Sequence, residues 1–430
     1  MHEKPGKRLM NLNQARRVML SMIVLLSSPS WCSEYDVSFS LAEAENIALA
    51  RSPELKSYQA KTEEFKQKSI AVNQLPDPHL RLGTINVPVD TFNFSQSPMT
   101  MIQVWLEQDF PRGKTLKYRA EQARDFSSVE VQKKEVMKLQ ILQSVRSSWL
   151  ETYYWLQAEK IVQKQKVIFD HLLRVTESML ANNKAQQKDV IRAQLELTEL
   201  EDRLLSIEQA LVTARSELAR WVGDTRASRA LPTQLPVWPS PEVVTELQSS
   251  MKQHPVLKKD SALVLANRAE VRLAEQNYKP EFKTELAYDF RQGVNFDGRK
   301  RSDFITAQVR VDLPLFPGNR QDRTLKARQE NLSSSREDQI SHYRALKEVL
   351  DKQNIAWKQH NKRASLYKQS LIPEAKQYAE ATMTAYQNAL TDFPTLARAY
   401  VRELDTELAG LRVNIDRDLA RINLLYLQGK

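Results

Sequence analysis

Side chains that could carry catalysis or bind a metal are few in this chain and stand apart. The 430 residues include one cysteine, Cys32, which excludes a disulfide framework and a cysteine-based zinc site. The six histidines are isolated, and there is no His-Glu-x-x-His, phosphate-binding loop or dinucleotide fingerprint. Asp77-Pro-His79 is a weak metal pair, and the soft ligands Met99 and Met101 more simply pack between a loop and a strand. The sequence therefore predicts neither an enzyme nor a cofactor or metal.

Charged side chains instead alternate with apolar ones along extended segments. The stretches 282–291 and 305–313 have apolar residues at every second position, and 102–107 does the same. Strands of about ten residues with one apolar and one charged face are typical of outer-membrane β-barrels, although a half-buried soluble sheet alternates similarly. On the barrel interpretation the polar face lines water, and its residues are Gln103, Glu107, Lys283, Glu285, Asp289, Arg291, Gln308 and Arg310.

Long helices must carry these strands, because residues that break helices are scarce. The chain has 9 glycines, and no proline occurs between Pro111 and Pro232. We expect helices at about 114–182 and 188–221, and again at about 320–388 and 394–427. The longest would extend roughly 100 Å at about 1.5 Å per residue, which is too long for a compact globule.

The sequence is an internal duplication. Pro53 and Pro255 lie 202 positions apart, and Phe110-Pro111 answers Phe316-Pro317 at an offset of 206. The repeats are predicted at 33–222 and 242–430, joined by a proline-rich linker at 223–241. Each has short helices, a β-hairpin and a long helical hairpin: 79–110 and 114–221 in the first, 281–316 and 320–427 in the second. Four strands per chain cannot close a barrel, so several chains must contribute.

The first 32 residues are predicted to be a signal peptide. A basic start precedes the apolar stretch Val18–Leu26, which is too short to span a bilayer. Lipidation of Cys32 stays open. Removing this segment takes away five basic residues and one acidic residue, which weakens the argument from the net charge of +10 for a nucleic-acid partner, and none is predicted. A mean hydropathy of −0.53 excludes a polytopic helical membrane protein.

Ordered motifs resemble the TolC family of outer-membrane efflux proteins over the whole mature chain. They occupy residues 41–44, 48–56, 76–78, 108–114, 311–320 and 385–394. The resemblance implies an α+β membrane protein: a homotrimer whose twelve-stranded β-barrel in outer-membrane lipid continues into a periplasmic α-barrel of helical hairpins. It also implies a passive duct that works with a periplasmic adaptor and an inner-membrane pump of the RND type.

Two details of the resemblance concern cargo and gating. Residues 82–90 and 97–101 resemble the branch associated with heavy-metal efflux. Tyr386 matches a tyrosine at the family's periplasmic tip, but the family's acidic ring falls on Thr395 and Arg398, and its turn glycine is Ala389. The remaining gate candidates are Asp189, Arg192 and Asp392. They could equally be ordinary solvated helix-end charges.

A second class of function remains open from sequence alone. Exported coiled coils also serve as periplasmic scaffolds or adaptors that have no membrane barrel. Fractionation separates the two hypotheses, because a scaffold is released by osmotic shock whereas a duct requires detergent.

Overall fold

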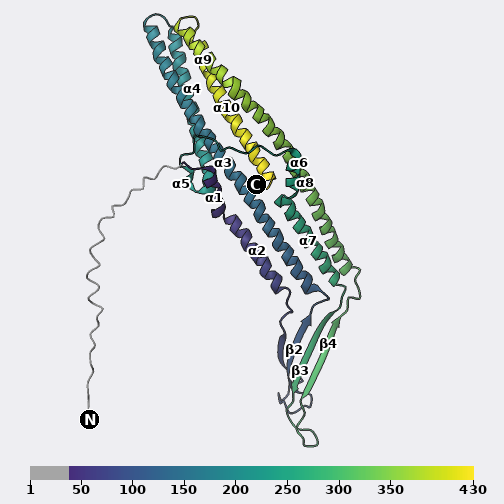
Figure 1. Cartoon of the computed structure of the whole chain (residues 1–430). Coiled ribbons are helices and arrows are strands. Elements are labelled where there is room, and N and C mark those ends of the chain that lie inside the picture. The colour runs from purple at the N-terminus through teal and green to yellow at the C-terminus, as the bar shows by residue number, and fades with distance from the viewer. Residues whose placement is uncertain (1–37) are drawn as a thin grey trace, which may run out of the picture.

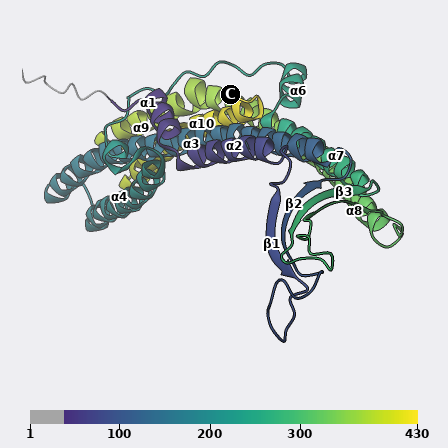
Figure 2. The same ribbon diagram turned by 90° about the horizontal axis from the view of Figure 1, so that it is seen from below.

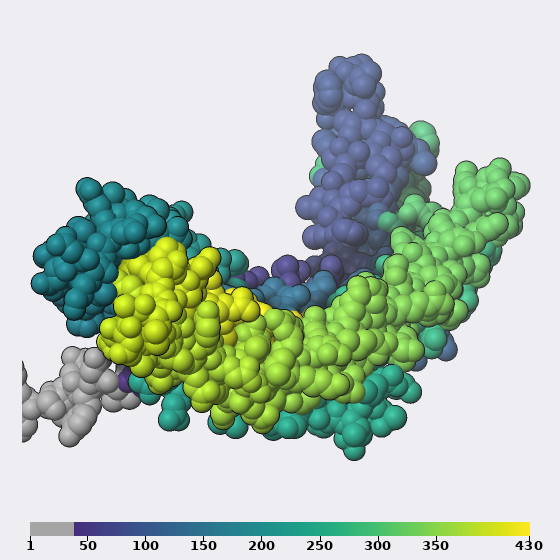
Figure 3. All heavy atoms as spheres, turned by 90° about the horizontal axis from the view of Figure 1, so that it is seen from above, coloured from purple at the N-terminus to yellow at the C-terminus, as the bar shows by residue number. Residues whose placement is uncertain are grey.

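The computed structural model describes residues 38–430, so the predicted signal peptide lies outside the described residues. These residues form a long rod of helices with a β-sheet at one end (Figure 1). Seen from above, the helices follow an arc that is hollowed on one side (Figure 3). Within residues 38–430, no helix is both long enough and apolar enough to cross a membrane.

The first long hairpin consists of α3 (Thr115–Ala181) and α4 (Gln187–Val222). Apolar side chains recur every three or four residues along α4, as in a coiled coil, and Leu197, Leu200 and Leu211 are buried in the seam. Near the tip, Leu197 and Leu200 join α10 side chains such as Leu396 in one core. The hairpin is therefore stabilised by packing along its length rather than around one central core.

The second long hairpin differs from the prediction of one continuous helix to about residue 388. Here α8 (Gln321–Leu366) passes through a π-helical turn, η1 (Tyr367–Leu371), into α9 (Ile372–Gln387), and α10 (Phe393–Leu427) returns. Pro373 explains the interruption, since it has no N–H for the helix ladder and its ring crowds the preceding turn. A helix that tolerates proline in its interior must widen or kink at that point.

Shorter helices brace the rod. They are α1 (Leu41–Arg51), α2 (Pro53–Ala71), α5 (Asp224–Ala227), α6 (Val244–Lys252) and α7 (Pro255–Gln276). Ser52 and His254 cap α2 and α7 at equivalent positions of the two repeats, and each precedes a proline in the first turn. Halfway along the rod, Phe39, Trp149 and Leu218 are buried in a second core.

The sheet contains β1 (His79–Ile85), β2 (Met101–Phe110), β3 (Glu281–Phe290) and β4 (Phe304–Asp312), in the order β1-β2-β3-β4 with antiparallel pairing. Each repeat contributes one hairpin, and β2 pairs with β3 across the duplication. The strands curve together (Figure 2). The predicted class, helical hairpins plus four amphipathic strands from a duplicated chain, is confirmed. Closure into a trimeric barrel stays a prediction.

Candidate functional site: the sheet and the helical tip

The sheet exposes apolar side chains of the kind that soluble proteins usually bury. The register puts Leu82, Val104 and Tyr288 on one face. Apolar side chains on that face are open, with Leu82 69% and Ile305 74% exposed, whereas Asp289 on the opposite face is 3% exposed. Soluble proteins bury such a continuous apolar surface, so this face requires a partner or an apolar surrounding.

On the polar face, charges cluster near the end that joins the helices. Lys283 lies 3.3 Å from Glu107 and 3.1 Å from Asp109, and Arg81 lies 3.3 Å from Glu107 while stacking over Trp105. Because these groups remain partly hydrated, the pairs contribute little to stability. They instead make this face wettable.

The other predicted lining residues of the polar face follow the register. Glu285 is opposite both Glu107 and Gln308, and Lys283 is opposite Arg310. Arg310 also borders a cleft of about 180 Å³ with Asp109, Glu281, Phe282, Lys283 and Asp312. A single face thus carries charges of both signs from β2, β3 and β4.

Toward the outer end the polar face becomes buried. Gln103 is opposite Asp289, and Thr306 donates a hydrogen bond to the Asp289 carboxylate at 3.3 Å. Arg291 lies one residue beyond β3, and its guanidinium donates to the Pro98 carbonyl at 2.6 Å. Arg291 was predicted to line the channel along with the strand residues, but here it contacts a loop.

At the opposite end of the molecule, the two helical turns repeat each other bond for bond. Lys184 N donates to Met179 O at 2.8 Å, and Leu390 N donates to Ala385 O at 2.9 Å, an offset of 206 in both donor and acceptor. Asn183 and Ala389 both have a left-handed backbone, with φ of 56° and 57°. The turns are thus homologous, and they enclose a cleft of about 320 Å³.

The charged tip candidates are placed as helix-end groups. Asp392 caps α10 by accepting from Thr395 N at 3.0 Å, and Asp189 accepts from Gln186 N at 3.1 Å in a capping box. Hydrogen bonds from Thr395 lower the pKa of the Asp392 carboxyl. Arg192 pairs with Glu196 at 3.1 Å, and Arg398 donates to the Thr395 hydroxyl at 3.2 Å.

Tyr386 lies beneath these caps. It is buried against Phe393, with ring centroids 6.0 Å apart, and its hydroxyl has no hydrogen-bond partner within residues 38–430. A buried phenol usually finds a partner, so this oxygen is the tip's unsatisfied polar group.

One polar contact was not predicted from the sequence. Arg412 of α10 makes two 2.9 Å hydrogen bonds to Glu151 of α3, and it also pairs with Asp416 at 2.7 Å. Burial lowers the pKa of Arg412, but these carboxylates outweigh it and the net shift is upward. Glu151 and Arg412 are 261 residues apart, so no local pattern could link them.

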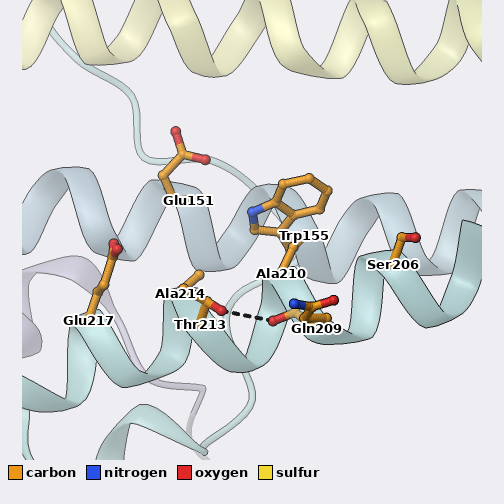
Figure 4. Close-up of a pocket in the computed structure, with 8 residues that line it drawn as sticks. All are labelled: Glu151, Trp155, Ser206, Gln209, Ala210, Thr213, Ala214 and Glu217. Atoms are coloured by element: carbon orange, nitrogen blue, oxygen red, sulfur yellow. Dashed lines mark hydrogen bonds between the residues drawn. The ribbon is translucent and has the colours of Figure 1, made fainter.

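Beside this ion pair lies a cleft of about 430 Å³ between α3 and α4 (Figure 4). Trp155 and Glu151 from α3 line it together with small α4 side chains such as Ala210 and Ala214. The Thr213 hydroxyl donates a hydrogen bond to the Gln209 carbonyl of the same helix at 3.0 Å. Among the described residues, no group of three or more His, Cys, Asp and Glu side chains could hold a metal.

No protein-family model and no curated protein matches this sequence. Solved structures do match. CusC, in a study of transmembrane channel formation, has a TM-score of 0.76 at 13% identity over 91% of this chain and 92% of that one. The outer membrane protein VceC of Vibrio cholerae has 0.74 at 16%, over 90% and 96%, and the CmeC outer membrane channel of Campylobacter jejuni has 0.76 at 10%, over 90% and 85%. The chain has the fold of these channels. At such identities the likeness concerns the fold.

Proposed function

We propose that this chain is one subunit of a passive trimeric duct that sits in the outer membrane and extends into the periplasm. Solutes would reach it from an inner-membrane pump of the RND type through a periplasmic adaptor. The exposed apolar face of the sheet carries the proposal. On β2 and β3 its apolar side chains are more exposed than the polar side chains of the opposite face. A lipid-facing strand has this pattern, with charges turned toward a water-filled interior. The duct would perform no covalent chemistry.

The sheet edges support assembly from several copies. Within the described chain, β1 and β4 each have a strand neighbour on one side only. An unpaired edge in hydrocarbon leaves backbone groups without hydrogen bonds, each costing several kcal/mol. Pairing β4 of one copy with β1 of the next removes every edge, and three copies give an even-numbered barrel of twelve strands. The shared fold with outer-membrane channels supports the same assembly.

Fractionation and conductance test the proposal together. The mature protein is expected in the outer-membrane fraction, to need detergent, to behave as a trimer, and to produce steps of ionic current in a planar bilayer. Release by osmotic shock as a detergent-indifferent monomer would instead indicate a periplasmic scaffold. The exposed apolar face counts against that alternative.

For the cargo we propose heavy-metal cations, on the resemblance of residues 82–90 and 97–101 to the corresponding efflux branch. A deletion strain is expected to lose tolerance to heavy-metal salts while its tolerance to organic drugs changes little. The reverse outcome would assign a drug pump as the partner and leave the duct proposal intact.

For the closed end we propose the helical tip, where Tyr386, Asp189, Arg192, Asp392 and Arg398 gather on two homologous turns. The chain itself does not pair the two arginines with the two aspartates. Within one chain, Arg398 acts on Asp392 only through its charge, which helps to lower the pKa of that carboxyl. We propose that any direct latch forms between copies.

A further inference from the structure

The outer end of the polar face is buried on its two central strands, β2 and β3. Ala287 and Asp289 both lie on this face, yet they are only 2% and 3% exposed, whereas Glu285 on the same strand is half-buried. A sheet face open to water does not bury its side chains so deeply. The β1–β2 loop (86–100) and the β3–β4 loop (291–303) lie together at this free end of the sheet (Figure 1).

Arg291 reaches the β1–β2 loop from the polar side of the sheet. Its position continues the alternation of Ala287 and Asp289, and its guanidinium stacks over Phe304, which is opposite Asp289 on β4. It donates to the Pro98 carbonyl through Nη2 at 2.6 Å and through Nε at 3.1 Å. The first loop is therefore held on the polar face and not on the apolar one.

Arg301 ties the two loops to each other. Its Nη1 donates to the carbonyls of Ser95 at 3.2 Å, Ser97 at 2.8 Å and Gln292 at 3.0 Å, and the side chain is buried. Gly293 lies so close that a Cβ there would be 3.1 Å from the Ser95 carbonyl oxygen. Carbonyls from both loops thus converge on one guanidinium nitrogen of Arg301.

The two basic residues before Arg301 do not hold the loops and serve as a comparison. Arg299, with its side chain 87% exposed, is 3.9 Å from Asp297 and contacts no loop carbonyl among the described residues, and Lys300 is also exposed. Of three consecutive basic residues, only Arg301 is engaged with the β1–β2 loop.

We propose that Arg291 and Arg301 are positioning residues that hold the two outer loops across the polar face, forming a second constriction at the outer mouth that limits the size of what passes. This inference rests on the proposed duct. It places a restriction at the opposite end of the molecule from the helical tip, and one built from backbone carbonyls and guanidinium groups rather than from helix ends.

Cysteine accessibility tests this directly. Ala287→Cys places a small thiol under the loops without touching either tie, and intact cells are treated with a bulky, membrane-impermeant maleimide. Labelling is expected to be slow, and to become at least about tenfold faster when Arg301→Ala or Arg291→Ala is added, because the loops then leave the polar face. Arg299→Ala in the same background is the matched control and should leave labelling slow. The unsubstituted chain serves as the blank for Cys32.

Two further measurements distinguish a failure of the proposed constriction from a failure of the proposed duct. Asp297→Cys, on the exposed part of the β3–β4 loop, should label on intact cells. If it does not, the loops do not face the exterior and the proposed function itself fails. If it labels while Ala287→Cys reacts equally fast with and without Arg301, the constriction is refuted. The Arg301→Ala channel should admit larger polyethylene glycols than the wild-type or Arg299→Ala channel, at unchanged trimer yield. Single-channel currents recorded in the presence of polymers of increasing size measure this.

Discussion

Ala389 occupies a backbone conformation that favours glycine. Its φ of 57° lies in the left-handed region, where a Cβ costs roughly 1–2 kcal/mol. The side chain is exposed, so nothing compensates by packing. We therefore expect Ala389→Gly to stabilise the second turn by roughly 1 kcal/mol or less, since glycine also gains freedom in the unfolded chain. Hydrogen exchange at the Leu390 amide, which closes the turn on Ala385, measures the gain. A faster exchange would contradict it.

Asp392 can be tested as a helix cap against its alternative role as a latch. Asparagine caps a helix nearly as well as aspartate, whereas alanine does not. If the carboxylate only caps α10, Asp392→Ala loosens the tip and raises conductance, while Asp392→Asn behaves as wild type. If its charge latches neighbouring copies, both substitutions open the channel, and Arg398→Ala opens it too.

The pKa of Asp392 adds a pH readout at the same position. Because hydrogen bonding from Thr395 lowers this pKa in the folded state, the cap contributes fully above the unfolded value and is lost as pH falls through the folded value. Protection of the Thr395 amide should therefore persist at pH 5 and decline only in stronger acid. Loss of protection between neutrality and pH 5 would assign the transition to another group.

At the scale of elements, the two long hairpins diverge at one place. Where the second repeat has Pro373 and Gly410, the first has Val167 and Leu204 at the offset of 206. A Cβ on Gly410 would lie 2.8 Å from Ile372 Cδ1 and 3.2 Å from Tyr367 Cδ1, so α10 lies directly against the π-helical turn. The glycine permits the close approach that the widened turn demands.

Gly410→Leu should therefore destabilise the second hairpin by about 1–3 kcal/mol through overpacking. Gly410→Ala should cost less, because the Ile372 tip can rotate away and alanine favours helix. Denaturant unfolding of both variants measures the difference. Equal stability of Gly410→Leu and wild type would contradict this, because the π-helical turn would then make room for the larger side chain without any loss of stability.

The same elements show how far sequence reasoning reaches. Period-two alternation predicted the strands, and proline-free runs predicted the long helices, because both signals are local. The π-helical turn was missed although Pro373 was visible, since its accommodation depends on Gly410 in another helix. The role of Arg301 was missed for the same reason, as its carbonyl partners Ser95 and Ser97 lie more than two hundred residues away.

At the scale of the whole molecule, the decisive question is which face of the sheet meets lipid. Leu286 and Glu285 are adjacent on β3 and point to opposite faces; Leu286 is opposite Leu106 and Ala307 on the apolar one. Leu286→Arg would place a charge in hydrocarbon in every subunit, at about 2–4 kcal/mol each near the bilayer midplane. We expect this variant to fail to assemble in the outer membrane.

Glu285→Arg is the matched control, because it puts the same side chain one residue away on the face assigned to water. It should assemble normally and shift the reversal potential of the open channel toward anions, since three carboxylates become three guanidinium groups. Heat-resistant trimer on gels and reversal potential under a salt gradient are the two measurements. Assembly of Leu286→Arg together with failure of Glu285→Arg would mean that the apolar face turns inward, and a barrel in lipid could not then be built from these strands.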